Sequence, residues 1–173
     1  DLLIGIAMPG PFDYENGIAL MLHGKFLDIY NVNIKEELAK RLSISLDQIH
    51  FVNDAAAFME GEVFGGCVQD YTRIFGVTLG TGFGTTFYNG ETATDEDLWD
   101  APFRDSIFED FMATRWFVNR YEELTGEKIS GTKELLEKPQ DIQNMMFEEY
   151  ADTFSQFIVQ HVSKYQPEVL VIG

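Results

Sequence analysis

The stretch TLGTGFGTTFYNG, residues 78–90, decides the fold that we expect for this chain. It contains four glycines and four threonines, and β-prone, apolar sequence lies around the glycines at 73–79 and 83–88. This arrangement predicts a β-hairpin with a glycine-rich tip. A plain tight turn would account for the glycines, and so would a backbone that must approach a phosphate group closely.

Two well-known phosphate-binding loops do not fit this hairpin. The Rossmann loop needs a helix directly after Gly-x-Gly-x-x-Gly, whereas Gly80, Gly82 and Gly84 are spaced by two and precede strand-like sequence. The Walker loop needs Gly-Lys-Ser/Thr, which the stretch lacks. Two interpretations remain: a structural turn, and a tip whose N–H groups, with the hydroxyls of Thr78 and Thr81, form a nest for phosphate oxygens.

Strand-like and helix-like segments alternate on both sides of the hairpin. Strands are expected at 2–8, 18–22, 49–52 and 169–172, and helices at 34–42, 54–65, 106–124, 132–138 and 140–165. Asn33, followed three residues later by Glu36, is the expected N-cap of the first helix. Residues 91–105 are polar and acidic, without a clear period. Strand-helix-strand order with a hairpin in the middle predicts an α/β fold with a mixed sheet.

Composition limits the partners of the chain. It has 173 residues, 45% of them hydrophobic, which suffices for a core. The net charge of −17 disfavours binding to nucleic acid or to an anionic membrane, because phosphate contacts need Lys and Arg. The single Cys67 excludes an internal disulfide, favours a reducing compartment and is interpreted as a small packed residue. No apolar run approaches the ~20 residues of a membrane span, and no signal peptide opens the sequence, so we predict a cytoplasmic protein.

Two further strand ends carry special residues. Asn53 and Asp54 lie where a strand ends and a helix begins, and Gly10 lies in a Pro-Gly-Pro turn directly after the first strand. Ligands of open α/β sheets bind at the carboxyl edge of the strands, so the three strand ends predict one cleft. The simpler interpretation of Asp54 is that it only caps its helix.

Three motifs in this order, GIAMPGPFDYENG, VNDAAAFMEGE and GVTLGTGFGTTFYNG, resemble the ROK family of sugar kinases and related repressors. The closing VLVIG resembles the start of the family's adenosine-binding segment. The resemblance implies a mixed-sheet fold of the actin-like ATPase (ribonuclease H-like) type, with parts of two lobes around a cleft. Residues 1–53 would form the later part of the N-terminal lobe. Residues 54–173 would form the C-terminal lobe, with the phosphate-binding hairpin.

The resemblance also implies roles for single residues. Asp54 matches the catalytic base that accepts the proton of a sugar hydroxyl, and Asn53 and Gly10 match positions at the sugar. The phosphate-binding and adenosine-binding positions are Gly80, Thr81, Gly82, Gly84 and Gly173. ATP with Mg²⁺ is the implied cofactor, the magnesium being held mostly by phosphates and water.

The acidic segment departs from the family pattern. Where the family often carries Glu-x-Gly-His and a cysteine-rich zinc loop, this chain has Glu96 and Trp99 at the spacing of the Glu and the His, and no cysteines. We therefore predict no structural zinc, which needs about four N or S ligands. Glu109 matches a later sugar-binding glutamate of the family, and the alternative for Glu96 and Glu109 is a solvated acidic face. His23, His50 and His161 lack metal-ligand spacing and are interpreted as structural or surface residues.

The resemblance implies an ATP-dependent sugar kinase that phosphorylates a hydroxyl of a hexose or N-acetylhexosamine. The family's first phosphate motif lies outside this sequence, so half of the nucleotide site is missing and the activity of the isolated segment is left open. Two alternatives stay open, a ROK-type sugar-sensing regulator and a non-catalytic sugar-binding protein. The sequence decides neither the sugar, nor ATP against polyphosphate, nor whether the protein forms a homodimer.

Overall fold

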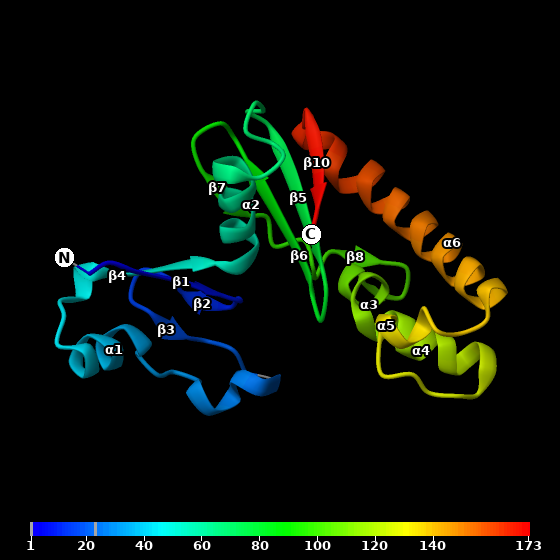
Figure 1. The fold of residues 1–173 in the computed structure, drawn as a ribbon, viewed down its shortest axis with the longest axis horizontal. Helices are drawn as coiled ribbons and strands as arrows, with labels where there is room; N and C mark the ends of the chain where they lie inside the picture. Colours follow the sequence, from blue (N-terminus) through cyan, green and yellow to red (C-terminus); the bar gives the residue numbers. More distant parts are fainter. Residues whose placement is uncertain (1, 23) are drawn as a thin grey trace.

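A computed structural model describes residues 2–22 and 24–173 of the chain. Figure 1 shows a smaller N-terminal unit, from β1 to β4, beside a larger sheet that is flanked by helices. Helix α2 (Asp54–Gly65) follows directly on β4 and connects the two units. None of the helices in the described ranges is both long enough and apolar enough to cross a membrane.

The N-terminal unit is built on two parallel strands. β1 (Ile4–Met8) pairs with β4 (Ile49–Asn53), and the register sets Met8 opposite Asn53, so both strands end at the same edge. β2 (Phe12–Asp13) and β3 (Ile18–Ala19) form a short hairpin, which reduces the strand predicted at 18–22 to two residues. The unit is completed by η1 (Gly24–Ile29), α1 (Ile34–Leu42) and η2 (Leu46–Gln48).

Helix α1 begins as the sequence predicts. The Asn33 side chain accepts a hydrogen bond from the backbone N–H of Glu36, at 3.0 Å, which confirms Asn33 as the N-cap. The apolar face of this helix closes the core of the N-terminal unit. The buried members of that core are Phe12, Ala19, Met21, Ala39, Ile49 and Phe51.

The larger sheet is mixed and contains the predicted glycine hairpin. Its strand order is β10-β5-β6-β7, from β5 (Ile74–Leu79), β6 (Phe83–Tyr88), β7 (Ala93–Asp95) and β10 (Val169–Ile172). β10 runs parallel to β5, and the other two pairings are antiparallel. The hairpin closes between Leu79 and Phe83, so Gly80, Thr81 and Gly82 form its tip.

Side chains alternate between the two faces of this sheet. Gly76 faces α2, because a Cβ there would lie 2.6 Å from the methyl group of Met59. Phe75 faces the other way and packs with Phe157 at the end of α6 (Gln140–Phe157). Helices α2 and α6 therefore cover opposite faces of one sheet (Figure 1).

The helical region after the hairpin is more broken than predicted. The helix expected at 106–124 is two helices, α3 (Phe108–Met112) and α4 (Thr114–Thr125), separated by Ala113 in an extended conformation. The break lets both the N–H and the hydroxyl of Thr114 donate to the carbonyl of Gly80, each at 2.8 Å. In place of one continuous helix, the chain forms two, and the second is hydrogen-bonded to the hairpin tip.

The remaining elements are short. β8 (Pro102–Phe103) and β9 (Ser106–Ile107) pair within or next to the acidic segment, and α5 (Thr132–Leu135) precedes α6. The helix predicted at 140–165 is α-helical only to Phe157. A π-helical turn, η3 (Ile158–Val162), and a 3₁₀ turn, η4 (Ser163–Tyr165), follow it.

Two sequence interpretations can be checked against burial. Cys67 is exposed, so its interpretation as a packed residue is wrong: it follows the Gly65-Gly66 end of α2, and its thiol lies 3.4 Å from a carboxylate oxygen of Glu62. This hydrogen bond raises the pKa of the thiol. Of the histidines, His161 packs on Phe157 and has a structural role, His50 is exposed, and His23 lies outside the described residues.

Candidate functional site

The first two strand ends are brought together by a tyrosine. The Tyr14 hydroxyl donates to the carbonyl of Met8, at 3.1 Å, and accepts from the side-chain amide of Asn53, at 3.1 Å. A Cβ at Gly10 would lie 3.6 Å from the same hydroxyl. Gly10 and Asn53 therefore share an edge, as the sequence predicts, and Tyr14 joins them without having been foreseen.

Asn53 is the N-cap of α2 and uses its whole side chain within the protein. Its Oδ1 accepts from the N–H groups of Ala55, at 2.8 Å, and Ala56, at 3.1 Å. Its Nδ2 donates to Tyr14 and to Oδ2 of Asp95, at 2.7 Å. An amide has two donors and two acceptor positions, so no hydrogen-bonding capacity of Asn53 is left over. With an exposed fraction of only 8%, it holds the edge together.

Asp54 has a different environment from its neighbour. Because Asn53 caps the helix, the interpretation of Asp54 as the N-cap is wrong. Asp54 occupies the first helical position, is exposed, and has one oxygen at 3.0 Å from the N–H of Ala55. The second carboxylate oxygen has no hydrogen-bond partner in the part of the chain that the structure describes, and is available to an external hydroxyl.

Asp95 is a residue of this edge that the sequence did not reveal. Loss of water around its carboxyl raises its pKa, and the nearby carboxylates of Asp97 and Asp54 raise it further. Burial likewise raises the pKa of Tyr14. The signal that could have found Asp95 is its place at the end of β7, the strand after the glycine hairpin. The pairing of β7 with β6 brings Asp95 to Asn53.

The hairpin runs directly against the start of α2. A Cβ at Gly84 would lie 3.2 Å from Cβ of Ala55, the residue after Asp54. On the far side of the tip, Oε2 of Glu109 accepts from the N–H of Phe83, at 3.1 Å, and would lie 3.0 Å from a Cβ at Gly82. Ala55, the residue after Asp54, and Glu109 thus border the same short segment, residues 82–84.

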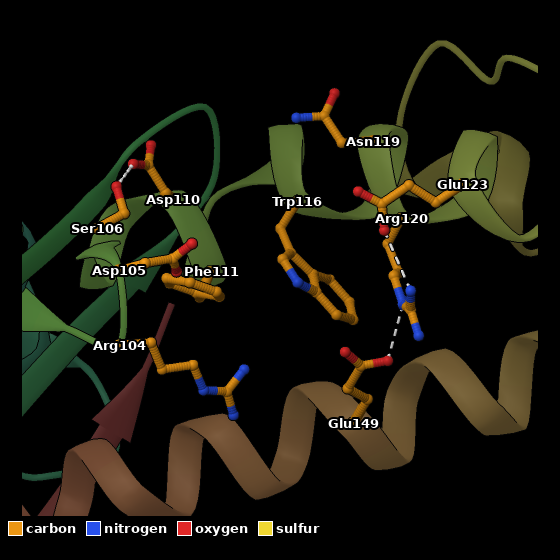
Figure 2. Close-up of a pocket in the computed structure, with 10 residues that line it drawn as sticks. All are labelled: Arg104, Asp105, Ser106, Asp110, Phe111, Trp116, Asn119, Arg120, Glu123 and Glu149. Atoms are coloured by element: carbon orange, nitrogen blue, oxygen red, sulfur yellow. Dashed lines mark hydrogen bonds and ion pairs between the residues drawn. The ribbon is translucent and has the colours of Figure 1, made fainter.

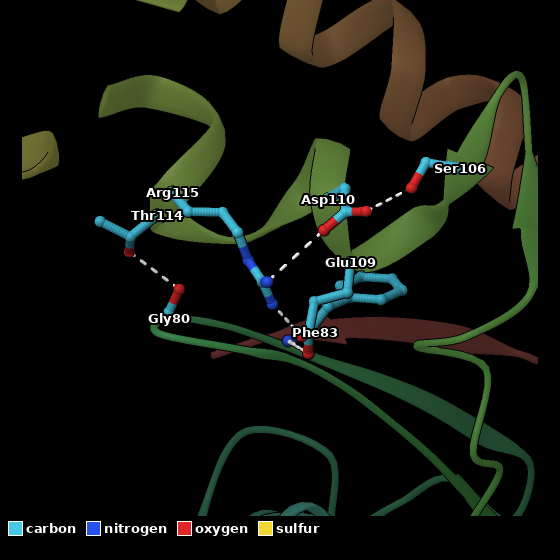
Figure 3. A network of polar contacts seen from close by, with 7 residues as sticks. All are labelled: Gly80, Phe83, Ser106, Glu109, Asp110, Thr114 and Arg115. Carbon is cyan, nitrogen blue, oxygen red and sulfur yellow. Dashed lines mark hydrogen bonds and ion pairs between the residues drawn. The ribbon is translucent and has the colours of Figure 1, made fainter. Parts of the chain in front are cut away.

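Figure 3 shows how the tip is held from the side of α3 and α4. The carbonyl of Gly80 accepts from Thr114, and the N–H of Gly80 donates to the carbonyl of Gly82, at 3.0 Å. The Arg115 guanidinium forms ion pairs with Glu109 and, at 3.4 Å, with Asp110. A guanidinium paired with two carboxylates therefore lies beside the glycine tip.

The glycines of the hairpin are not needed for a left-handed backbone. Positive φ values among the glycines occur at Gly17, Gly90 and Gly126. Gly80, Gly82 and Gly84, at and near the hairpin tip, therefore have none. Close approach is what they permit. Gly84 leaves room for Thr78 and α2, whereas a Cβ at Gly80 would meet no atom within 4 Å.

Glu96 lies in a separate network from Asn53 and Asp54. Its carboxylate accepts from the hydroxyls of Tyr165 and, at 2.7 Å, Thr94. The Tyr165 ring packs at a tilt against Phe75, on the face of the sheet covered by α6, and burial together with the hydrogen bond to Glu96 raises the pKa of its hydroxyl. The structure does not bring this glutamate together with the other predicted sugar residues.

Gly173 extends β10 beside the start of the hairpin tip. Its N–H donates to Val77, at 2.9 Å, and its carbonyl accepts from Leu79, at 2.8 Å. A Cβ there would lie 2.5 Å from the Phe58 ring, so glycine is required for packing. Within the described ranges, no group of three or more His, Cys, Asp or Glu side chains is placed to hold a metal ion. The absence of structural zinc stays a prediction.

Comparison with known proteins gives consistent likenesses. A model of the ROK family matches residues 2–95. The chain is 41% identical over 81 residues to a glucokinase of Thermotoga maritima, covering 47% of this chain and 24% of that protein. It is 28% identical over 162 residues to an N-acetyl-D-glucosamine kinase of Mannheimia succiniciproducens, covering 78% of this chain and 51% of that protein. The chain thus spans about half the length of the latter relative, and less of the former.

Two solved structures show the fold. A glucokinase from Parabacteroides distasonis superposes with a TM-score of 0.80 at 22% identity, covering 99% of this chain and 56% of that one. A ROK family glucokinase from Streptomyces griseus, in complex with glucose and AMPPNP, gives 0.77 at 18% identity, with 99% and 65% coverage. These likenesses confirm the predicted class, a mixed-sheet α/β fold of the actin-like ATPase type.

Proposed function

Because this chain belongs to the ROK family, we propose that it forms part of a sugar kinase that transfers the γ-phosphate of ATP to a sugar hydroxyl. The observation that carries the proposal is that the first turn of α2, which begins with Asp54, and Glu109 border the same glycine hairpin, through Ala55 at Gly84 and through Glu109 at residues 82 and 83. A carboxylate for the acceptor and an open backbone tip for the donor phosphate then lie side by side. Phosphoryl transfer requires mainly this kind of positioning and charge neutralisation.

Asp54 acts as the general base in this proposal. A sugar hydroxyl is a poor nucleophile unless its proton is accepted as the new bond forms, and a positioned carboxylate contributes about 10² to 10⁴ in rate. Asp54 is exposed and has one carboxylate oxygen without a hydrogen-bond partner among the described residues, so a hydroxyl can donate to it directly. Asn53 caps the helix that carries this base and so fixes its position.

The acceptor sugar is held by carboxylates that border the hairpin. Sugar hydroxyls donate to carboxylate oxygens. Glu109 offers such oxygens at the hairpin tip and Asp95 offers them beside Asn53, and each oxygen can accept a further hydrogen bond. Gly10, which has no side chain, leaves the backbone of the turn after β1 accessible to the sugar ring. The kinases that the chain resembles are named for glucose and for N-acetyl-D-glucosamine, which supports a hexose or N-acetylhexosamine as the acceptor. Glu96 stays a weaker candidate, since it binds Tyr165, which lies on the face of the sheet covered by α6.

The donor phosphates bind at the hairpin tip in this proposal. Among the described residues, the N–H groups of Thr81 and Gly82 have no hydrogen-bond partner, whereas those of Gly80 and Phe83 are engaged. Free adjacent N–H groups form an anion-binding concavity. Arg115 lies beside it, paired with Glu109 and Asp110, and Mg²⁺ would come with the nucleotide, held by phosphate oxygens and water. The AMPPNP complex of the Streptomyces griseus relative supports a nucleotide donor.

The two lobes of the kinase would meet where β4 gives way to α2. We place residues 1–53 in the N-terminal lobe and 54–173 in the C-terminal lobe, so the Asn53-Asp54 peptide lies at the boundary. Gly173 would begin the contacts to adenosine. It directly follows β10, the strand that runs beside the hairpin, which supports contacts on the donor side.

The test is Asp54→Asn in the full-length protein, assayed with ATP over a panel of hexoses and N-acetylhexosamines. An amide cannot accept the hydroxyl proton, so we expect kcat to fall by about 10² or more. Sugar affinity, measured by calorimetry, should fall only modestly, because one hydrogen bond contributes roughly 0.5–3 kcal/mol. The matched control is Asp152→Asn, an exposed carboxylate on α6 that is remote in sequence from the site.

Two outcomes would overturn parts of the proposal. A near-normal kcat in the Asp54→Asn protein would remove Asp54 from the chemistry. Sugar binding without phosphoryl transfer from ATP or polyphosphate, in the unaltered protein, would favour a regulator or a non-catalytic sugar-binding protein.

A further inference from the structure

A cavity of about 300 Å³ lies away from the hairpin, between the β8–β9 turn, the start of α4 and the middle of α6 (Figure 2). Its walls combine aromatic rings with charged and amide groups: Arg104, Asp105, Phe111, Trp116, Asn119 and Glu149. None of these residues belongs to the proposed sugar or nucleotide site. The volume is at the lower end of small-molecule sites, which span roughly 300–1,000 Å³.

Trp116 carries an unused hydrogen-bond donor into this cavity. The residue is only 8% exposed, and its ring packs on Phe117 and Tyr150. In Figure 2 the indole nitrogen points toward the space between Phe111 and Arg104. Within the described part of the chain, the indole N–H has no hydrogen-bond acceptor. Within the described residues, every fully buried side-chain nitrogen and oxygen has a hydrogen-bond partner, so this N–H reaches solvent at the cavity and is free to donate to a ligand there.

Arg104 is a second donor with spare capacity. Its guanidinium lies 4.7 Å from the ring centre of Phe103 and 5.2 Å from that of Phe111, which holds it at the cavity wall. Its one hydrogen bond within the described residues is a long one, 3.4 Å, to the hydroxyl of Thr153, and it has no carboxylate partner there. The neighbouring Asp105 has no partner among those residues either, so a donor and an acceptor lie unused side by side.

The charge of the lining argues against an anionic ligand. Arg120 is already neutralised by Glu123, at 3.1 Å, and Glu149, at 2.9 Å. Two arginines and four carboxylates line the cavity, a formal balance of 2 − 4 = −2. A metal ion is not favoured either, since no group of three acidic, His or Cys side chains in the described ranges is placed to coordinate one. The lining suits a neutral ligand that both donates and accepts hydrogen bonds.

We propose that this cavity is a second binding site, for one neutral polyhydroxylated ring such as a monosaccharide. Trp116 Nε1–H and the Arg104 guanidinium donate to hydroxyl oxygens, and the Asp105 carboxylate accepts from a hydroxyl hydrogen. The rings of Phe111 and Trp116 offer apolar surface to the C–H face of the sugar. The proposal does not depend on the kinase activity, because it uses none of the residues assigned to it.

The experiment uses Trp116 as its own reporter. The chain has two tryptophans, so Trp99→Phe in the full-length protein leaves Trp116 as the one indole of these two. Titration with glucose and with N-acetylglucosamine should give a saturable change in its fluorescence. Calorimetry of the unaltered protein should give two sugars per chain, and Arg104→Met, with unchanged thermal unfolding, should reduce this to one or weaken the second site at least about fivefold.

A conservative variant separates packing from hydrogen bonding. Trp116→Phe keeps an aromatic ring but removes the N–H, and we expect the second calorimetric site to weaken while the kinase kcat is kept. One sugar per chain, with a Trp116 signal that follows the midpoint of the substrate site, would overturn the proposal. A response to inorganic phosphate in place of sugar would overturn the assigned ligand class. Either failure leaves the Asp54 test of the kinase unaffected.

Discussion

The glycines in the paired strands of the hairpin, Gly76 and Gly84, which we call its base, and the glycine at its tip, Gly80, serve different purposes. At the base, a Cβ at Gly84 would lie 2.4 Å from the Thr78 hydroxyl, and one at Gly76 would lie 2.6 Å from Met59 and from Thr86. At the tip, a Cβ at Gly80 would meet nothing within 4 Å. The base glycines are therefore required by the protein's own packing, whereas packing makes no demand at Gly80. A glycine with space around it, at the tip of a hairpin, is the one that a ligand can explain.

The largest effect is expected at the base. Gly84→Val would drive side-chain atoms into Thr78 and the first turn of α2, and overpacking of this kind costs about 1–3 kcal/mol or more. Urea or thermal unfolding measures the loss. The matched control is Gly61→Ala, in the interior of α2, where a Cβ meets nothing and helix propensity rises by about 1 kcal/mol. Equal stability of Gly84→Val and the unaltered protein would erase the distinction between base and tip.

A smaller and more selective effect is expected at the tip. Gly80→Ala should leave stability within about 0.5 kcal/mol, because the added methyl enters open space. If the tip holds the donor phosphates, the same methyl narrows their site and raises the KM for ATP, by about tenfold for 1.4 kcal/mol of lost binding. Sugar affinity should be kept.

Gly80 is a sharper probe than Gly82. A side chain at Gly82 would also press on Glu109, 3.0 Å away, and so disturb the acceptor side. An unchanged KM for ATP in the Gly80→Ala enzyme would contradict phosphate binding at the tip and favour the other interpretation, a structural turn.

The sequence predicts the features that depend on local patterns and misses those that depend on distant contacts. The hairpin, the Asn33 cap and the closing strand follow from local patterns, and the structure confirms them. Features that depend on contacts distant in sequence were missed. The break at Ala113 accompanies the hydrogen bonds of Thr114 to Gly80, 34 residues away, and residues 106–124 contain neither Pro nor Gly that would predict it.

The candidate site shows the same limit. Asn53 and Asp54 were found because they adjoin a strand end, yet their roles as cap and exposed carboxylate depend on side-chain geometry that the sequence leaves open. Asp95 joins Asn53 across 42 residues, through the register of β7 on β6. Glu96, its neighbour, matched a family spacing but faces the other side of the sheet with Tyr165. A one-residue shift along a strand reverses the face, which spacing alone does not resolve.

The smallest expected effect concerns Asp95, beside the exposed Asp54 on the same edge. Burial raises the pKa of Asp95, so the folded protein binds this proton more tightly than the unfolded chain does. Stability from this group is then fully present below the unfolded pKa of 3.8 and is lost as the pH rises through the higher folded pKa. At pH 7 the ionised Asp95 carboxylate slightly lowers the free energy of unfolding. The side chain still contacts water, and screening by that water keeps the cost small.

Asp95→Asn tests this sign directly. The new amide oxygen can still accept from Asn53, so the bond that holds the helix cap is kept while the charge is removed. The exposed N–H of Asp97, which donates to the other carboxylate oxygen at 3.0 Å, is left to donate to water. We expect a slightly higher unfolding midpoint than that of the unaltered protein at pH 7, and no difference near pH 3, where the aspartate is protonated. Asp152→Asn, an exposed carboxylate on α6, measures the general gain from removing one negative charge from a chain of −17. A gain from Asp95→Asn that is no larger than this control, or that persists at pH 3, would show that the carboxylate is as well solvated as Asp54, and the contrast between the two aspartates would be lost.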